Sequence, residues 1–182
     1  IFMKRKIKEY IYWQKYDLVL FLVWNRTMSN KSKSFTRFNI VNWEIDNLYH
    51  AIALKFGLSD SAMNILYILS YENGKAPLSF ICRYSGLQKQ TVNSALRKLE
   101  DEGLIKLESI NGKEKSVLLT EKGKEKAKCT VDHLIEWEND IITSFDEKDF
   151  SLLLSMNEKY LNQLKNHLAQ YMDEENENWN IW

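Results

Sequence analysis

The chain has 182 residues, of which 45% are hydrophobic and 27% charged, which fits one soluble domain with an elaboration and excludes a large multidomain enzyme. Its two cysteines, Cys82 and Cys129, stand far apart and outside any CxxC pattern, which argues against a disulfide scaffold and leads us to expect a cytoplasmic protein. Lysine plus arginine (25) balances aspartate plus glutamate (25), and a net charge of zero by itself argues against a nucleic-acid partner.

That balance hides an uneven distribution of charge along the chain. Basic residues outnumber acidic ones by nine to two in residues 1–40 and by eight to five in 75–119. Acidic residues outnumber basic ones by four to one in 41–74 and by fourteen to seven in 120–182. A basic segment between acidic ones indicates a protein that meets an anion with one part of its chain.

Residues 1–40 form a basic extension that contains an apolar run at 18–24. The run is at the lower limit for a secretory signal, no cleavage site follows it, and it falls short of the about 20 residues that span a bilayer. Three interpretations stay open: a protein that begins at Met28, an amphipathic helix that packs on a partner subunit, or an interfacial membrane helix. We expect no membrane partner.

Two helices and a short third one are predicted before residue 87. Apolar residues three and four apart predict a helix at 41–56, within a segment 41–58. Ser59 is a typical cap for the second helix, Asn73-Gly74 is a turn signal, and a short third helix opens at Pro77 and ends near Gly86.

The next helix, at 88–98, has an apolar face and a polar face. Val92, Leu96 and Leu99 recur at helical spacing, whereas the opposite face offers hydrogen-bonding and basic side chains. Such side chains match base edges and phosphates, although a merely solvated face is the ordinary alternative. Short alternating strands at 105–108 and 116–119 then enclose Asn111-Gly112 in a basic hairpin, which favours DNA binding.

Two long helices are predicted to follow the hairpin. Thr120 caps the first, whose apolar stripe runs to Phe145, and a coiled-coil-like seam with one interrupting asparagine, Asn157, runs through the second at 149–172. Residues 173–182 form an acidic tail. The fold class predicted is mainly α with a small β-hairpin wing: a winged helix-turn-helix at 59–119, flanked by long dimerisation helices at 41–58 and 120–172.

A set of ordered motifs resembles the MarR (multiple antibiotic resistance regulator) family over residues 41–172. The motifs are Gly86-Leu87, Thr91-Val92, Leu99, Gly103-Leu104 and Leu119-Thr120-Glu121-Lys122-Gly123. The resemblance implies a homodimeric transcriptional repressor that binds double-stranded DNA at a pseudo-palindromic operator. It also implies a small aromatic or anionic effector that binds between the DNA-binding lobe and the dimerisation helices.

These features assign candidate roles to single residues. We expect four residues to read bases and four to hold phosphates: Gln90, Thr91, Ser94 and Arg97 in the first group, and Lys89, Lys98, Lys113 and Lys115 in the second. The family's wing tip usually carries an arginine that enters the minor groove, but here lysines stand there. Lysine lacks arginine's planar fork, so we expect phosphate contact at the tip.

The remaining candidates have structural alternatives. Four aromatic residues are expected in the core and are also the candidate effector pocket: Trp43, Tyr49, Phe56 and Tyr67. Cys82 is expected to be a small core residue, while Cys129 could face either way. The histidines His50, His133 and His167 are solitary, so we expect no metal site, and we expect no cofactor. No catalytic motif stands out, and the rival hypothesis is a helical protein-interaction module that has lost specific DNA binding.

Overall fold

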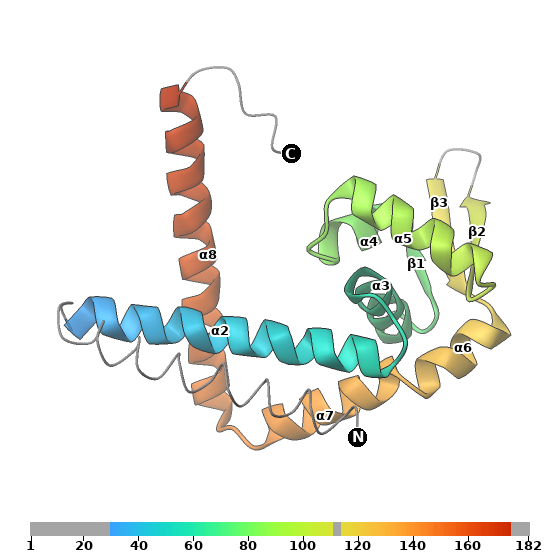
Figure 1. Cartoon of the computed structure of the whole chain (residues 1–182), viewed down its shortest axis with the longest axis horizontal. Helices are drawn as coiled ribbons and strands as arrows, with labels where there is room; N and C mark the ends of the chain where they lie inside the picture. Colours follow the sequence, from blue (N-terminus) through green and yellow to red (C-terminus); the bar gives the residue numbers. More distant parts are fainter. Residues whose placement is uncertain (1–29, 111–113, 176–182) are drawn as a thin grey trace, which may run out of the picture. The chain divides into compact units, whose positions relative to one another are not determined.

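The computed structural model of the protein describes residues 30–110 and 114–175, and Figure 1 labels their helices and strands. The chain divides into two units, one that ends at Ile52 and one that begins at Ala53, and each is described by itself. Met28 and the rest of residues 1–29, the hairpin tip at 111–113 and the tail beyond 175 lie outside the described residues.

Helix α2 (Asn30–Lys55) supplies the described part of the first unit through Ile52, and it starts well before the predicted residue 41. The predicted start is wrong because apolar periodicity marks only part of the helix, whereas the backbone stays helical where neither glycine nor proline interrupts it. Trp43 and Tyr49 are 62% and 36% exposed, so the expectation that they belong to the core is wrong for the single chain.

The core of the second unit is built around α3 (Asp60–Tyr71). The Ser59 hydroxyl accepts a hydrogen bond from the Ala62 amide at 3.3 Å, which confirms the predicted cap. Helix α3 packs against α5 (Lys89–Asp101) and α7 (Val131–Thr143), and the short α4 (Leu78–Tyr84) lies against both α3 and α5. The largest fully buried apolar side chains come from all these helices and the sheet: Ile65, Leu66, Leu69, Ile81, Val92, Leu99, Val117 and Val131.

A three-stranded antiparallel sheet, in the order β1-β3-β2, forms the wing. Strands β2 (Ile105–Ile110) and β3 (Glu114–Leu119) are the predicted hairpin, longer than expected. Strand β1 (Lys75–Pro77) was not predicted from the sequence, because three residues that include a proline carry no strand pattern. Asn73 and Gly74, with φ of 57° and 89°, make the predicted turn into it.

The helix predicted from 120 to 145 is broken into α6 (Glu121–Lys128) and α7. Thr130 leaves helical geometry (φ −137°, ψ −89°), and its hydroxyl donates to the Lys126 carbonyl at 2.6 Å. The prediction of one helix is wrong because the buried stripe, Ala127 and then Val131, continues through the break and hides it. A threonine hydroxyl that bonds a preceding carbonyl competes with the helical ladder at this point.

Helix α8 (Glu147–Glu175) matches the last predicted helix. The expected seam residues Leu154, Leu161, Leu164, Leu168 and Tyr171 are 40% to 53% exposed. Cys82 is half-buried and Cys129 exposed. Within the described ranges, no helix on its own is long and apolar enough to cross a membrane, and only the bent pair Lys33–Lys55 with Asp60–Tyr71 meets the length and composition test.

Candidate nucleic-acid interface

Helix α5 presents the four residues expected to read bases. Its inner face is buried through Val92, Ala95, Leu96 and Leu99. The expected base readers Gln90, Thr91, Ser94 and Arg97 are all exposed. Gln90, Ser94 and Arg97 are spaced four and three apart, so they share one side of the helix. The structure therefore gathers these side chains on one outward surface.

The lysines expected to hold phosphates divide between α5 and the hairpin. Lys89 and Lys98 are exposed on α5, and Lys98 Nζ lies 4.0 Å from Glu102 Oε1. An exposed ion pair of this length contributes little, so it leaves Lys98 available to an anion. Lys115 is exposed on β3, whereas Lys113 lies outside the described residues.

The strand register separates the wing's lysines onto two faces. Lys115 shares its face with the buried Val117, two residues on, which is the face that packs on the helices. Lys75 and Lys106 both pair with Leu118 and therefore lie on the opposite face. The sequence does not indicate that these two lysines form a group, because the short strand β1 carries no strand pattern.

One carboxylate reduces the charge of this second face. Lys106 Nζ lies 2.7 Å from Glu108 Oε1. The hydrogen bond and charge of Lys106, with a smaller effect from Lys75, lower the pKa of Glu108 below its ordinary value of 4.5. Glu108 therefore offsets the charge of Lys106, whereas Lys89 and Arg97 on α5 and Lys115 on β3 are exposed.

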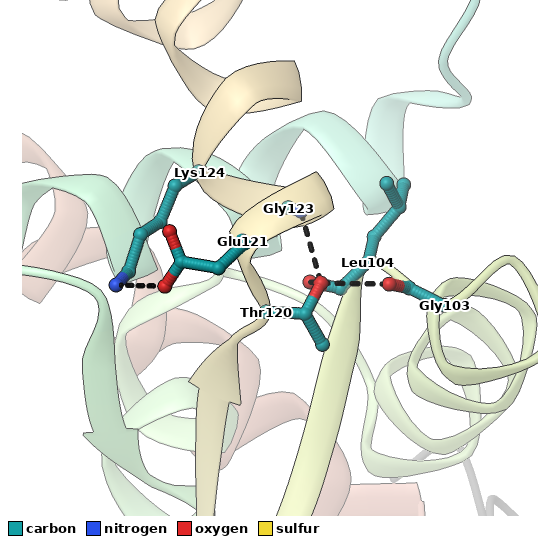
Figure 2. Close-up of polar contacts among 6 residues, drawn as sticks. All are labelled: Gly103, Leu104, Thr120, Glu121, Gly123 and Lys124. Carbon is teal, nitrogen blue, oxygen red and sulfur yellow. Dashed lines mark hydrogen bonds and ion pairs between the residues drawn. The ribbon is translucent and has the colours of Figure 1, made fainter.

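Hydrogen bonds of Thr120 fix the base of the wing to the segment that follows α5, and Figure 2 shows those of its hydroxyl. The Thr120 hydroxyl accepts from the Gly123 amide at 3.0 Å, which confirms the predicted cap, and donates to the Gly103 carbonyl at 2.7 Å. The Thr120 amide donates to the Leu104 carbonyl at 3.0 Å. We call these residues, Gly103, Leu104, Thr120 and Gly123, the Thr120 junction.

The junction explains the glycine of the Leu-Thr-x-x-Gly motif. A Cβ atom on Gly123 would lie 1.9 Å from the Leu104 carbonyl oxygen and 2.9 Å from its carbon. No side chain fits there unless the backbone moves. Packing therefore requires glycine at this position of the motif, and this close contact fixes where the wing follows α5 and where α6 begins.

The candidate effector residues fall into both units. Trp43 and Tyr49 belong to α2, whereas Phe56 and Tyr67 belong to the second unit, where each already has a partner. The Phe56 ring lies 6.3 Å from the Trp137 ring, and the Tyr67 hydroxyl donates to Glu138 at 2.6 Å. An effector pocket that joins all four stays a prediction. Across residues 30–110 and 114–175, no group of three or more histidine, cysteine or acidic side chains is placed to hold a metal ion.

Comparison with known proteins agrees with this geometry. Residues 56–113 match the model of the MarR family. A MarR family regulator from Neisseria meningitidis is 21% identical, with a TM-score of 0.65 over 80% of this chain and 100% of that one. A MarR/EmrR family transcriptional regulator from Acinetobacter sp. ADP1 is 22% identical, with a TM-score of 0.60 over 76% and 99%.

A structure of the MepR–DNA complex of S. aureus is also similar, at 19% identity and a TM-score of 0.61 over 75% of this chain and 99% of that one. No curated protein sequence matches. At these identities the solved structures confirm the predicted fold, and the family model confirms the resemblance over residues 56–113.

Proposed function

We propose that this chain, whose residues 56–113 match the MarR family model, is a DNA-binding transcriptional regulator that reads a specific sequence. The observation that carries the proposal is the surface of α5, where hydrogen-bonding and basic side chains are exposed while the opposite side is buried. The fold is that of MarR transcription regulators, and one protein that shares it was solved as a complex with DNA.

The exposed side chains divide between two tasks. Arg97 has the planar fork that pairs with guanine, and Gln90 the amide that pairs with adenine, in the major groove. Lys89, Lys98 and Lys115 are point charges that suit phosphates, and their contacts set affinity and its dependence on salt.

The protein acts as a homodimer in this proposal. Helices α7 and α8 expose apolar side chains along much of their length, including the seam of α8. Apolar patches of this extent rarely stay in water, and a second copy of the same helices would cover them. Two recognition helices would then enter successive major grooves, about 34 Å apart, on a pseudo-palindromic operator.

Regulation follows from the same arrangement. A small aromatic or anionic effector that binds one subunit spacing better than the other would shift the population of the DNA-competent form. We propose that the unliganded dimer represses transcription in the cytoplasm.

Selection from a random duplex pool, followed by gel shifts at several salt concentrations, tests the proposal. Arg97→Ala should cost about 1–3 kcal/mol and relax base choice at one position. Lys115→Ala should weaken all duplexes alike and reduce the salt slope by about one. Lys159→Ala, which removes an exposed lysine from α8, is the matched control and should change neither quantity.

Two results would contradict these assignments. Equal behaviour of the Arg97 and Lys115 variants would show that the division into base and phosphate contacts is wrong. Failure of a folded dimer to retain any duplex at low salt would favour the alternative, a helical protein-interaction module, which the absence of arginine in the hairpin makes the natural rival.

A further inference from the structure

Two hydrogen bonds join α3 to α7 beside the buried core. The Tyr67 hydroxyl donates to Glu138 Oε2 at 2.6 Å, and the Ser70 hydroxyl donates to Asp132 Oδ1. Each bond joins residues more than sixty positions apart in the sequence. We call these four residues the α3–α7 link.

The α3–α7 link both holds α3 and α7 together and constrains the angle between them. All four side chains are partly buried, and the apolar contact between the helices lies beside them, at Val131 and Leu134. Apolar burial is non-directional, so packed helices can slide or rotate. Hydrogen bonds from a hydroxyl to a carboxylate are short and directional.

The two bonds also act at separate points. Tyr67 and Ser70 are about one turn apart on α3, while Asp132 and Glu138 are about 9 Å apart along α7. One bond alone would add a directional constraint at only one point of α7. Two bonds at this separation fix the direction of α7 relative to the winged helix.

The rest of α7 faces a different surface. Trp137, Ile141 and Ile142, with Phe145 just beyond the helix, are 41% to 58% exposed. The proposed function assigns such apolar surface to the contact with a second copy. Helix α7 therefore connects the winged helix to the dimer interface, and its direction sets how far apart the two copies of α5 stand.

We propose that Tyr67, Ser70, Asp132 and Glu138 are positioning residues that make the regulator selective for the spacing of its operator half-sites. This inference rests on the proposed function. The link belongs to α3 and α7 rather than to α5 or the wing, so its effect on DNA binding is indirect: it determines which separation of two half-sites the dimer fits without distortion.

The experiment uses the full chain and a duplex recovered from the random pool. Variants of that duplex with half-sites moved by one and two base pairs give a ratio of affinities for the best spacing and its neighbours. The double variant Tyr67→Phe with Ser70→Ala removes both hydroxyls and keeps the ring of Tyr67. We expect the spacing ratio to fall about fivefold or more, the size of an ordinary coupling between two sites.

Two control variants separate positioning from stability. Ile65→Val shortens a fully buried side chain of α3, so it should lower the thermal midpoint and leave the spacing ratio unchanged. Asp140→Asn removes an exposed carboxylate from α7 and should alter neither the thermal midpoint nor the spacing ratio. A double variant that loses thermal stability but keeps the wild-type spacing ratio would overturn the proposal.

A distance measurement in the absence of DNA keeps the two proposals distinguishable. Two spin labels, at Glu100→Cys on α5 and Asn139→Cys on α7, report the direction of α7. Cys82 and Cys129 are replaced by alanine, and the labelled chains are diluted in unlabelled protein so that only distances within one chain are measured. We expect a broader distance distribution in the double variant. If no duplex is recovered, the proposed function fails and half-site selectivity fails with it. If the wild type binds DNA but the distribution does not broaden, the link does not fix α7 and only this inference fails.

Discussion

Gly123→Ala tests the Thr120 junction by adding a single methyl group to it. The new Cβ would start 1.9 Å from the Leu104 carbonyl oxygen, and real Cβ contacts essentially never fall below 3.0 Å. The close atom belongs to the backbone, so no side chain can turn away to make room. The start of α6 must retreat from Leu104, which disturbs the bonds from the Thr120 amide and hydroxyl.

Several effects of known size determine the result. Alanine favours a helix by about 1 kcal/mol relative to glycine. Against this stand overpacking, about 1–3 kcal/mol, the weakened cap, about 1 kcal/mol, and one strained backbone hydrogen bond, about 1 kcal/mol. The variant should be destabilised by about 2–4 kcal/mol, which lowers the thermal midpoint by about 5–15 °C in a chain of this length.

Urea unfolding followed by circular dichroism measures this free energy. Lys124→Ala, at the next position of α6, adds no atom to the junction and is the matched control. The control should stay within about 0.5 kcal/mol of the wild type. A Gly123→Ala protein as stable as the wild type, or stabilised as helix propensity alone predicts, would refute the close approach between α6 and Leu104.

Two further predictions concern the wing and α8. Because Lys106 lowers the pKa of Glu108, the carboxylate contributes stability above its ordinary pKa and loses this contribution as the pH falls through the lowered value. Glu108→Gln should therefore lower the thermal midpoint slightly at pH 6 and by progressively less as the pH falls below 4.5, and a difference that grows on acidification would contradict this sign. Leu161→Lys places a charge in the proposed interface, so it should convert the dimer into monomer in sedimentation velocity. Glu158→Lys, a control on the same helix, should stay dimeric. If both variants are dimers, the α8 seam is not the contact.

Local signals in the sequence predicted most of the winged helix. Ser59 and Thr120 each cap a helix as expected, because capping is an interaction within three residues. Gly86 ends α4 with a φ of 67°, and the periodicity of α5 correctly separated its buried and exposed faces. These features depend on neighbours along the chain, so the sequence alone contains them.

Features that depend on distant residues could not be predicted in this way. Strand β1 exists because Ala76 pairs with Val117, far along the chain, and nothing near Ala76 indicates that partner. The break at Thr130 depends on which of two bonding patterns a threonine adopts. The hydrogen bonds of Tyr67 and Ser70 could not be predicted because their acceptors lie on α7, more than sixty residues further along the chain.

The candidate site shows the same division. Gln90, Ser94 and Arg97 could be grouped from helical spacing alone. The separation of Lys115 from Lys106 onto opposite faces of the wing needed the strand register. The α5 residues of the candidate interface could thus be predicted, whereas the face of the hairpin that contributes to it could not.

The Thr120 junction joins α5 firmly to the base of the hairpin. The Thr120 hydroxyl bonds the Gly103 carbonyl, just after α5, and the Thr120 amide bonds the Leu104 carbonyl, just before β2. The two elements must travel as one block. In the proposed regulator, an effector that binds elsewhere would therefore change where each block stands and leave the base preference of the block unchanged. In the proposed regulator, the sequence of each operator half is therefore set by this block, whereas the distance between the halves is set separately, by the α3–α7 link.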